Sequence, residues 1–227
     1  RVGFSLEDLE SIFRSPVYPQ GYLPLGGGRI AAFWLPLMAL FTGARLEELA
    51  QLRVSDVKIA KDLGHYLVIS DLGNPTANLK NAYSRRNIPI HPILIACGFL
   101  QHVQERQSGY LFPDLKLDPR GKRSGYFSNW FSVYLRKKVG ITDTRKVFHS
   151  FRHTFKDLCR TCGIEESVHD ALSGHTTSSV SRQYGNDQFP MPPLFNAIGH
   201  FEISGLDLTH LYEQPIADTI KSQDIKI

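Results

Sequence analysis

Five short segments carry side chains whose types and spacing suit chemistry on a phosphate. They are residues 42–49, 78–80, 149–155 and 172–175, and the tyrosine at 184. The first has an arginine at a predicted helix start and a glutamate one turn later on the same face. A tyrosine hydroxyl can act as a nucleophile, guanidinium groups bind phosphoryl oxygens through two parallel hydrogen bonds, and lysine or histidine can move the protons. This combination suits the cleavage of a phosphodiester bond without a metal ion.

In this order, the segments resemble the catalytic domain of the tyrosine recombinases, the phage-integrase family. The resemblance runs from about Phe4 to Tyr184. Its most specific parts are the His-x-x-Arg-His-Thr-Phe segment at 149–155 and the Gly-His pair that precedes a tyrosine by nine residues. The resemblance implies a catalytic set of six residues: Arg45, Lys80, His149, Arg152, His175 and Tyr184.

The resemblance also implies the roles of these residues. Arg45 and Arg152 would pair with the scissile phosphate, where permanently charged planar guanidiniums match the non-bridging oxygens better than lysine does. Tyr184 would attack and form a covalent 3′-phosphotyrosyl intermediate, which conserves the bond energy so that resealing needs no ATP. We expect Glu48 to orient Arg45 or another site residue rather than to touch DNA.

The proton-handling roles fall on a lysine and two histidines. Lys80, in a predicted hairpin, would protonate the leaving 5′-oxygen, and Lys58 and Lys61 are nearby alternatives. His149 would help to remove the tyrosine proton or hold the phosphate. His175 would donate a hydrogen bond to a phosphoryl oxygen.

The composition is that of a packed protein. The chain has 227 residues, of which 42% are hydrophobic and 21% charged. Its longest apolar stretch, 30–41, is too short for a membrane span of about 20 residues, so it predicts a core helix and no membrane partner. Three cysteines indicate a reducing, cytoplasmic setting rather than a disulfide framework. The lone Cys-x-x-Cys at 159–162 lacks a second pair, which favours helix packing, and we expect no metal or cofactor.

The pattern along the chain predicts one mostly helical α+β domain with a small antiparallel sheet at one edge. Helices are expected after Ser5, over 30–41, over about 45–52 and at many positions beyond 91, with strands at 66–69 and 86–90. The three glycines at 26–28 indicate a flexible connector. A core of about 1–184 would carry the catalytic residues. The tail of about 185–227 would pack on its own or a neighbouring domain, and an N-terminal DNA-clasping domain is expected to be missing from this chain.

The charge distribution favours a nucleic-acid partner. The formal net charge is +4 and the pI about 8.9. Between 120 and 146, eight basic residues accompany a single acid, with aromatic residues between them. Lysine and arginine supply most sequence-independent affinity for DNA, although a solvated helix face would look similar. The candidate DNA-binding residues are Arg85, Arg86, Lys122, Arg123, Arg145 and Lys146.

The sequence therefore predicts a site-specific recombinase, or integrase, of a phage or other mobile element. It would act on double-stranded DNA at an attachment site, as a monomer when free and a tetramer when assembled on DNA. Two alternatives stay open. A type IB topoisomerase would use the same chemistry but relax supercoiled DNA without a recognition site. A non-catalytic DNA-binding module would form no covalent adduct.

Overall fold

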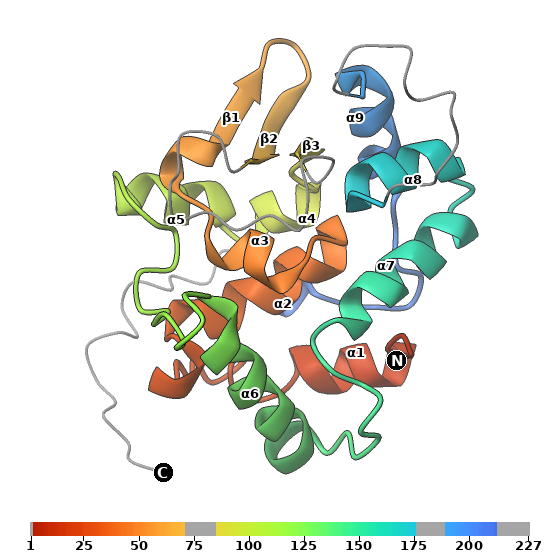
Figure 1. The fold of residues 1–227 in the computed structure, drawn as a ribbon. Coiled ribbons are helices and arrows are strands. Elements are labelled where there is room, and N and C mark those ends of the chain that lie inside the picture. Colours follow the sequence, from red (N-terminus) through yellow and green to blue (C-terminus); the bar gives the residue numbers. More distant parts are fainter. Residues whose placement is uncertain (1, 71–84, 176–188, 213–227) are drawn as a thin grey trace.

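The computed structural model describes residues 2–70, 85–175 and 189–212, which form a mixed α+β fold that is about half helical (Figure 1). The helices are α1 (Leu6–Phe13), α2 (Ile30–Thr42), α3 (Leu46–Ala50), α4 (Pro92–Ala96), α5 (Phe99–Arg106), α6 (Ser124–Tyr134), α7 (Ser150–Thr161), α8 (Glu166–Ser173) and α9 (Met191–His200). The strands are β1 (Val57–Ala60), β2 (Gly64–Ile69) and β3 (Arg86–Pro89). The helix-rich α+β class predicted from the sequence is confirmed at this level.

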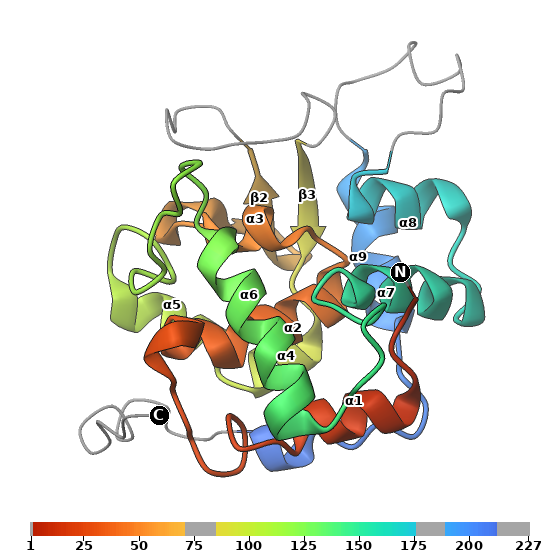
Figure 2. The same cartoon turned by 60° about the horizontal axis from the view of Figure 1, so that its bottom comes forward.

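Helix α2 forms the centre of the core. Each of its residues is buried, as expected for a helix that is apolar all round. Helices α3, α4 and α7 pack on it. Helix α6 packs on α3, and Figure 2 shows it running from there toward α1. Within the described ranges, no helix has both the length and the apolar character needed to cross a membrane.

Gly43 ends α2 and lets α7 approach closely. Its φ of 61° lies in the left-handed region, which glycine adopts without the steric cost that a side chain brings. A Cβ at this position would lie 2.3 Å from Cδ1 of Phe155 in α7. This close approach brings Arg152 on α7 next to the segment that begins α3 and carries Arg45.

The sheet lies at one edge of the molecule and is antiparallel, in the order β1-β2-β3 (Figure 1). Leu67 of β2 is opposite Val57 on one side and Ile88 on the other. The predicted strands at 66–69 and 86–90 are present with slightly different bounds. Strand β1 was not anticipated, because its two central residues are exposed and leave no clear alternation of buried and exposed positions.

The described part of the tail packs on its own domain. Helices α8 and α9 both contact β3. After α9, the ring of Phe201 lies 4.9 Å from that of Phe155 between centroids, and its carbonyl is 2.8 Å from Nε2 of His91. Leu208 and Leu211 are buried in the same core. The described residues after Pro190 therefore contact the core of their own chain.

Candidate active site

The carboxyl end of α8 gathers three arginines from three different elements. A helix leaves its last four carbonyls without partners and carries partial negative charge at that end. Here three consecutive carbonyls accept hydrogen bonds from guanidinium groups. Arg86 Nε donates to Leu172 O at 2.7 Å, Arg152 Nη1 to Ser173 O, and Arg45 Nη2 to Gly174 O at 3.4 Å. We call Arg45, Arg86 and Arg152 the arginine cluster.

Arg45 is the most accessible member of the arginine cluster. It immediately precedes α3, and its side chain is 26% exposed. Its backbone N–H donates to Glu48 Oε2 at 2.8 Å and its Nη1 to Glu48 Oε1 at 2.7 Å. Glu48 therefore contacts both the backbone and the side chain of Arg45 from the buried side.

Arg152 is buried on α7. Its Nη1 also donates to the carbonyl of Gly43 at 2.8 Å. Burial, together with the charges of Arg45 and Arg86, lowers the pKa of Arg152 to about 10. The guanidinium is still charged at neutral pH. Four cations (the arginine cluster and Lys156) here meet two carboxylates, Glu48 and Asp170, which leaves a local excess of positive charge. Because an incoming anion would relieve that excess, the arginine cluster suits phosphate binding.

Arg86 is much less accessible than Arg45. The sequence placed it among the DNA-contacting residues, but only 7% of its surface is exposed. Its Nη2 donates to Glu48 Oε2 at 2.8 Å, in addition to the bond with Leu172. Gly174 has a φ of 65°, and a Cβ there would lie 2.7 Å from Nη1 of Arg86. Arg86 is therefore a buried residue whose hydrogen bonds link β3 to α3 and α8.

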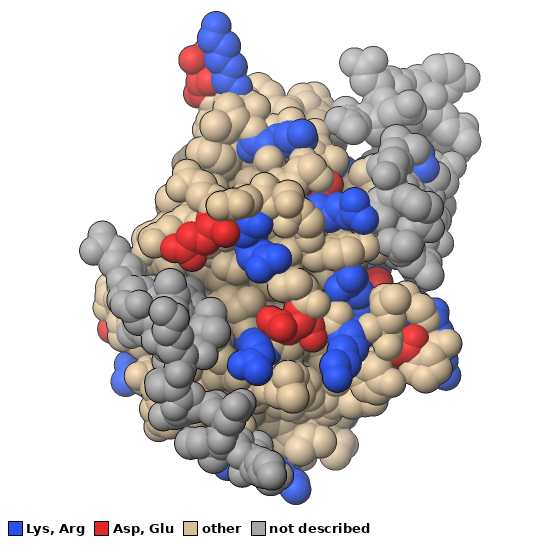
Figure 3. Space-filling view, turned by 90° about the vertical axis from the view of Figure 1, so that its left-hand side faces the viewer, with Lys and Arg blue, Asp and Glu red and all other residues tan. Residues whose placement is uncertain are grey.

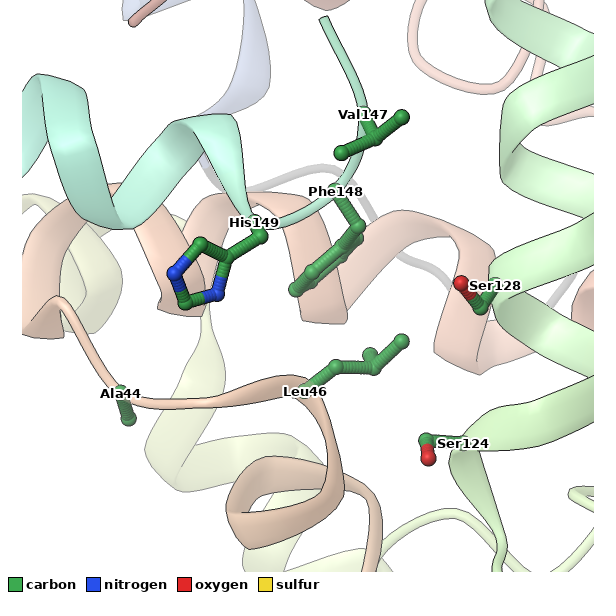
Figure 4. Close-up of a pocket in the computed structure, with 7 residues that line it drawn as sticks. All are labelled: Ala44, Leu46, Ser124, Ser128, Val147, Phe148 and His149. Atoms are coloured by element: carbon green, nitrogen blue, oxygen red, sulfur yellow. The ribbon is translucent and has the colours of Figure 1, made fainter. Parts of the chain in front are cut away.

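His149 lines a small pocket directly before α7. The pocket has a volume of about 180 Å³ and is lined by Ala44, Leu46, Ser124, Ser128, Val147, Phe148 and His149. In Figure 4 the imidazole and the two serines lie on opposite sides, with Leu46 and Phe148 between them. The volume is below the roughly 300 Å³ of the smallest pockets for drug-sized ligands. The pocket therefore has room only for a small chemical group.

His175 follows the α8 end and is half-exposed. Its backbone N–H donates to Asp170 O at 2.9 Å. Partial burial and the charge of Lys156 lower the pKa of the imidazole, and Asp170 raises it. The charges of Arg152 and Arg45 also lower the pKa of His175, so both arginines lie close enough to act on its imidazole.

Lys80 and Tyr184 lie outside the described residues, in 71–84 and 176–188. The described residues next to these stretches are informative. Arg86 lies two positions after the first stretch, and His175 directly precedes the second. Both belong to or adjoin the arginine cluster, so each stretch is joined to the chain close to the candidate site.

The remaining candidate DNA contacts differ in their surroundings. Lys122 is exposed and Arg85 half-buried. The Arg123 guanidinium lies 3.5 Å from the centroid of the Tyr110 ring, while Arg145 pairs with Asp143 and Lys146 with Asp8. Figure 3 shows lysine and arginine side chains spread over one face with acidic groups among them, rather than one continuous basic patch.

The sequence analysis did not identify the buried ion pair of Asp170 and Lys156, which lies beside the arginine cluster. Asp170 is 1% exposed and accepts from Lys156 Nζ at 3.0 Å. The signal in the sequence that could have found Asp170 is an acidic residue five positions before His175.

Within the described ranges, no three His, Cys, Asp or Glu side chains cluster closely enough to hold a metal ion. No protein-family model matches the chain, and a search of curated proteins found no significant match.

Proposed function

We propose that this chain is the catalytic domain of a site-specific DNA recombinase that cuts and rejoins DNA through Tyr184. The observation that carries the proposal is the convergence of Arg45, Arg152 and His175 at the carboxyl end of α8. These residues were selected from the sequence by a family resemblance that takes no account of contacts. Their meeting at one place, together with an excess of positive charge, supports that selection.

The proposed reaction is a phosphoryl transfer. The Tyr184 oxygen forms a bond to phosphorus, the bond from phosphorus to the 5′-oxygen breaks, and Lys80 gives that oxygen a proton. Arg45 and Arg152 neutralise the non-bridging oxygens. Each preorganised donor of this kind is typically worth about 3–4 kcal/mol in the transition state. His149 would accept the tyrosine proton or hold the phosphate, and the reverse reaction reseals the strand.

The proposed partner is double-stranded DNA at a specific attachment site, in the cytoplasm of a bacterial host. Free protein would be monomeric and would assemble as a tetramer on DNA. The pocket beside His149 offers room for a small group of the DNA backbone next to the scissile phosphate. Its two serine hydroxyls are of a type that commonly contacts DNA phosphates.

Covalent trapping tests the proposed function directly. A suicide substrate, nicked so that the fragment beyond the cut diffuses away, should accumulate a protein–DNA adduct that survives denaturing electrophoresis. Peptide mass spectrometry should locate the adduct on Tyr184. Absence of any adduct on random and candidate attachment-site DNA would favour a non-catalytic module. Relaxation of supercoiled plasmid that lacks a site would favour a topoisomerase.

Lys80 can be tested by changing the leaving group. Lys80→Ala should slow cleavage because an alkoxide is a poor leaving group without a proton. A bridging sulfur at the 5′ position leaves without that help, so it should restore most cleavage in Lys80→Ala. It should restore little in Arg152→Ala, whose defect is unbalanced charge on the non-bridging oxygens. Single-turnover cleavage rates on the oxygen and sulfur substrates give the comparison.

A matched control separates Lys80 from its alternatives. Lys58 lies on β1, where its side chain is exposed, and Lys58→Ala should cleave the oxygen substrate like the wild type. A Lys80→Ala variant that remains equally slow on the sulfur substrate would remove Lys80 from the role of acid. His149 would then be the first candidate.

A further inference from the structure

Asp170 is an almost fully buried carboxylate in the last turn of α8, beside the arginine cluster. Its Oδ1 accepts from Lys156 Nζ at 3.0 Å and lies 3.3 Å from Nδ1 of His169. Among the residues that the structure describes, no donor forms a hydrogen bond with Oδ2. A buried carboxylate oxygen without a hydrogen bond costs free energy. Half of this carboxylate is thus available for a partner.

The group that faces this oxygen is the imidazole of His175. Nδ1 of His175 is 3.9 Å from Oδ2 of Asp170. The left-handed turn at Gly174 and the backbone bond from His175 N–H to Asp170 O fix the two residues relative to each other. The His175 side chain is 51% exposed. A shift of about 1 Å would therefore bring the ring to the usual distance of a charge-assisted hydrogen bond.

We propose that Asp170 is a positioning residue that accepts a hydrogen bond from Nδ1 of His175 and thereby favours the protonated imidazole. The proposal rests on the proposed function and on the role that the resemblance implies for His175, which is to donate a hydrogen bond to a phosphoryl oxygen. With Nδ1–H directed at the carboxylate, Nε2 is the nitrogen left for the phosphate. Because neutral imidazole carries one proton, Nε2 can donate only in the imidazolium form.

The surrounding charges explain why such support is needed. Lys156 and Arg152 on α7 and Arg45 before α3 all act against protonation of His175. Arg86 from β3 packs against the adjacent Gly174 and adds positive charge to the same region. Asp170 is the acid that opposes them. Without its carboxylate, the charges that attract the phosphate would disfavour the protonated histidine still more.

Two substitutions break the same ion pair and should have opposite effects. Asp170→Asn removes the anion and should lower the titration midpoint of His175 by about one pH unit, the size expected for a charge a few ångströms away. Lys156→Gln removes a cation and should raise it. NMR titration of the His175 ring in the whole chain, assigned with His175→Gln, measures both.

The opposite signs separate positioning from packing. Loosening of α8 against α7 would move both midpoints in the same direction. An unchanged midpoint in Asp170→Asn, or a shift of the same sign in both variants, would overturn the proposal. If Asp170→Asn does not fold, Lys156→Gln still decides, because its midpoint must rise.

The pH dependence of cleavage provides a second readout. The imidazolium is present below its pKa and is lost as pH rises through it. In Asp170→Asn this loss should begin about one unit lower, which leaves up to about tenfold less cleavage above the midpoint and near-normal cleavage below it. A defect of equal size at every pH would contradict the proposal. The NMR titration needs no DNA, so it tests the Asp170–His175 pair separately from the proposed function. If no adduct forms but the two midpoints shift in opposite directions, the proposed function is wrong and the Asp170–His175 interaction is supported.

Discussion

The Tyr184→Phe variant should bind attachment-site DNA as tightly as the wild type and form no covalent adduct. Phenylalanine keeps the ring and removes only the hydroxyl, which is the proposed nucleophile. Binding should persist because its largest contribution comes from phosphate contacts with basic side chains. Mobility-shift titrations at one fixed salt concentration measure binding, and denaturing gels of the suicide substrate measure the adduct.

A surface tyrosine gives the control for this loss. Tyr212 is 37% exposed near the end of the described chain, and Tyr212→Phe should form the adduct at the wild-type rate. Persistence of the adduct in Tyr184→Phe would mean that another residue attacks the DNA. The assignment from the Gly-His and tyrosine spacing would then be wrong.

Replacing Glu48 with alanine should destabilise the folded chain by about 3–5 kcal/mol, the typical cost of removing one partner from a buried ion pair. Glu48 is 3% exposed and accepts from both Arg45 and Arg86. Its loss leaves the Arg86 guanidinium buried without the Glu48 carboxylate. Urea unfolding at neutral pH, followed by circular dichroism, measures the change. A loss below about 1 kcal/mol would show that the pair carries little free energy.

The same carboxylate should make stability depend on pH. Burial by itself would raise the pKa of Glu48, but the charge of Arg86 and the hydrogen bonds from Arg86 and Arg45 outweigh it and lower the pKa. A lowered pKa means that the stabilisation is present above the unfolded value of about 4.3 and is lost as pH falls through the folded value. The advantage of the wild type over Glu48→Gln should therefore shrink below about pH 4.

The neighbouring Glu47 supplies a matched control. Its carboxylate accepts from the backbone N–H groups of Arg123 and Ser124 at the start of α6, at 3.1 and 2.8 Å. Glu47 thus caps the first turn of α6. Glu47→Gln should lower the free energy of unfolding by at most about 2 kcal/mol. Equal losses at both positions would contradict a special role for the buried pair.

Local signals predicted the elements that depend on local interactions. Ser5 caps α1 and forms a capping box with Asp8, and the apolar run at 30–41 became the central helix. The glycines at 26–28 were misjudged as a flexible connector. Residues 25–27 form a 3₁₀ turn, and a Cβ on Gly27 would lie 2.9 Å from the Trp130 ring. That contact joins distant parts of the chain, so no local pattern could reveal it.

The limits at the site have the same physical origin. Arg86 and Arg145 are alike in a list of basic residues, yet one is buried against Glu48 and the other is 68% exposed beside Asp143. Burial depends on which surfaces meet, and the sequence does not state this. Asp170 was overlooked because its ion-pair partner Lys156 becomes a neighbour only when α7 and α8 pack together.

The three carbonyls at the end of α8 also tie the proposed cutting site to the completion of folding. Arg45, Arg86 and Arg152 reach them across sequence separations of 129, 86 and 21 residues. Contacts between distant residues require large loops to close, which costs chain entropy and slows their formation. The guanidiniums therefore stay scattered in partly folded or still-growing chains. Only a chain that has reached its native topology presents them together. Under the proposed function, incompletely folded molecules would therefore not cut DNA.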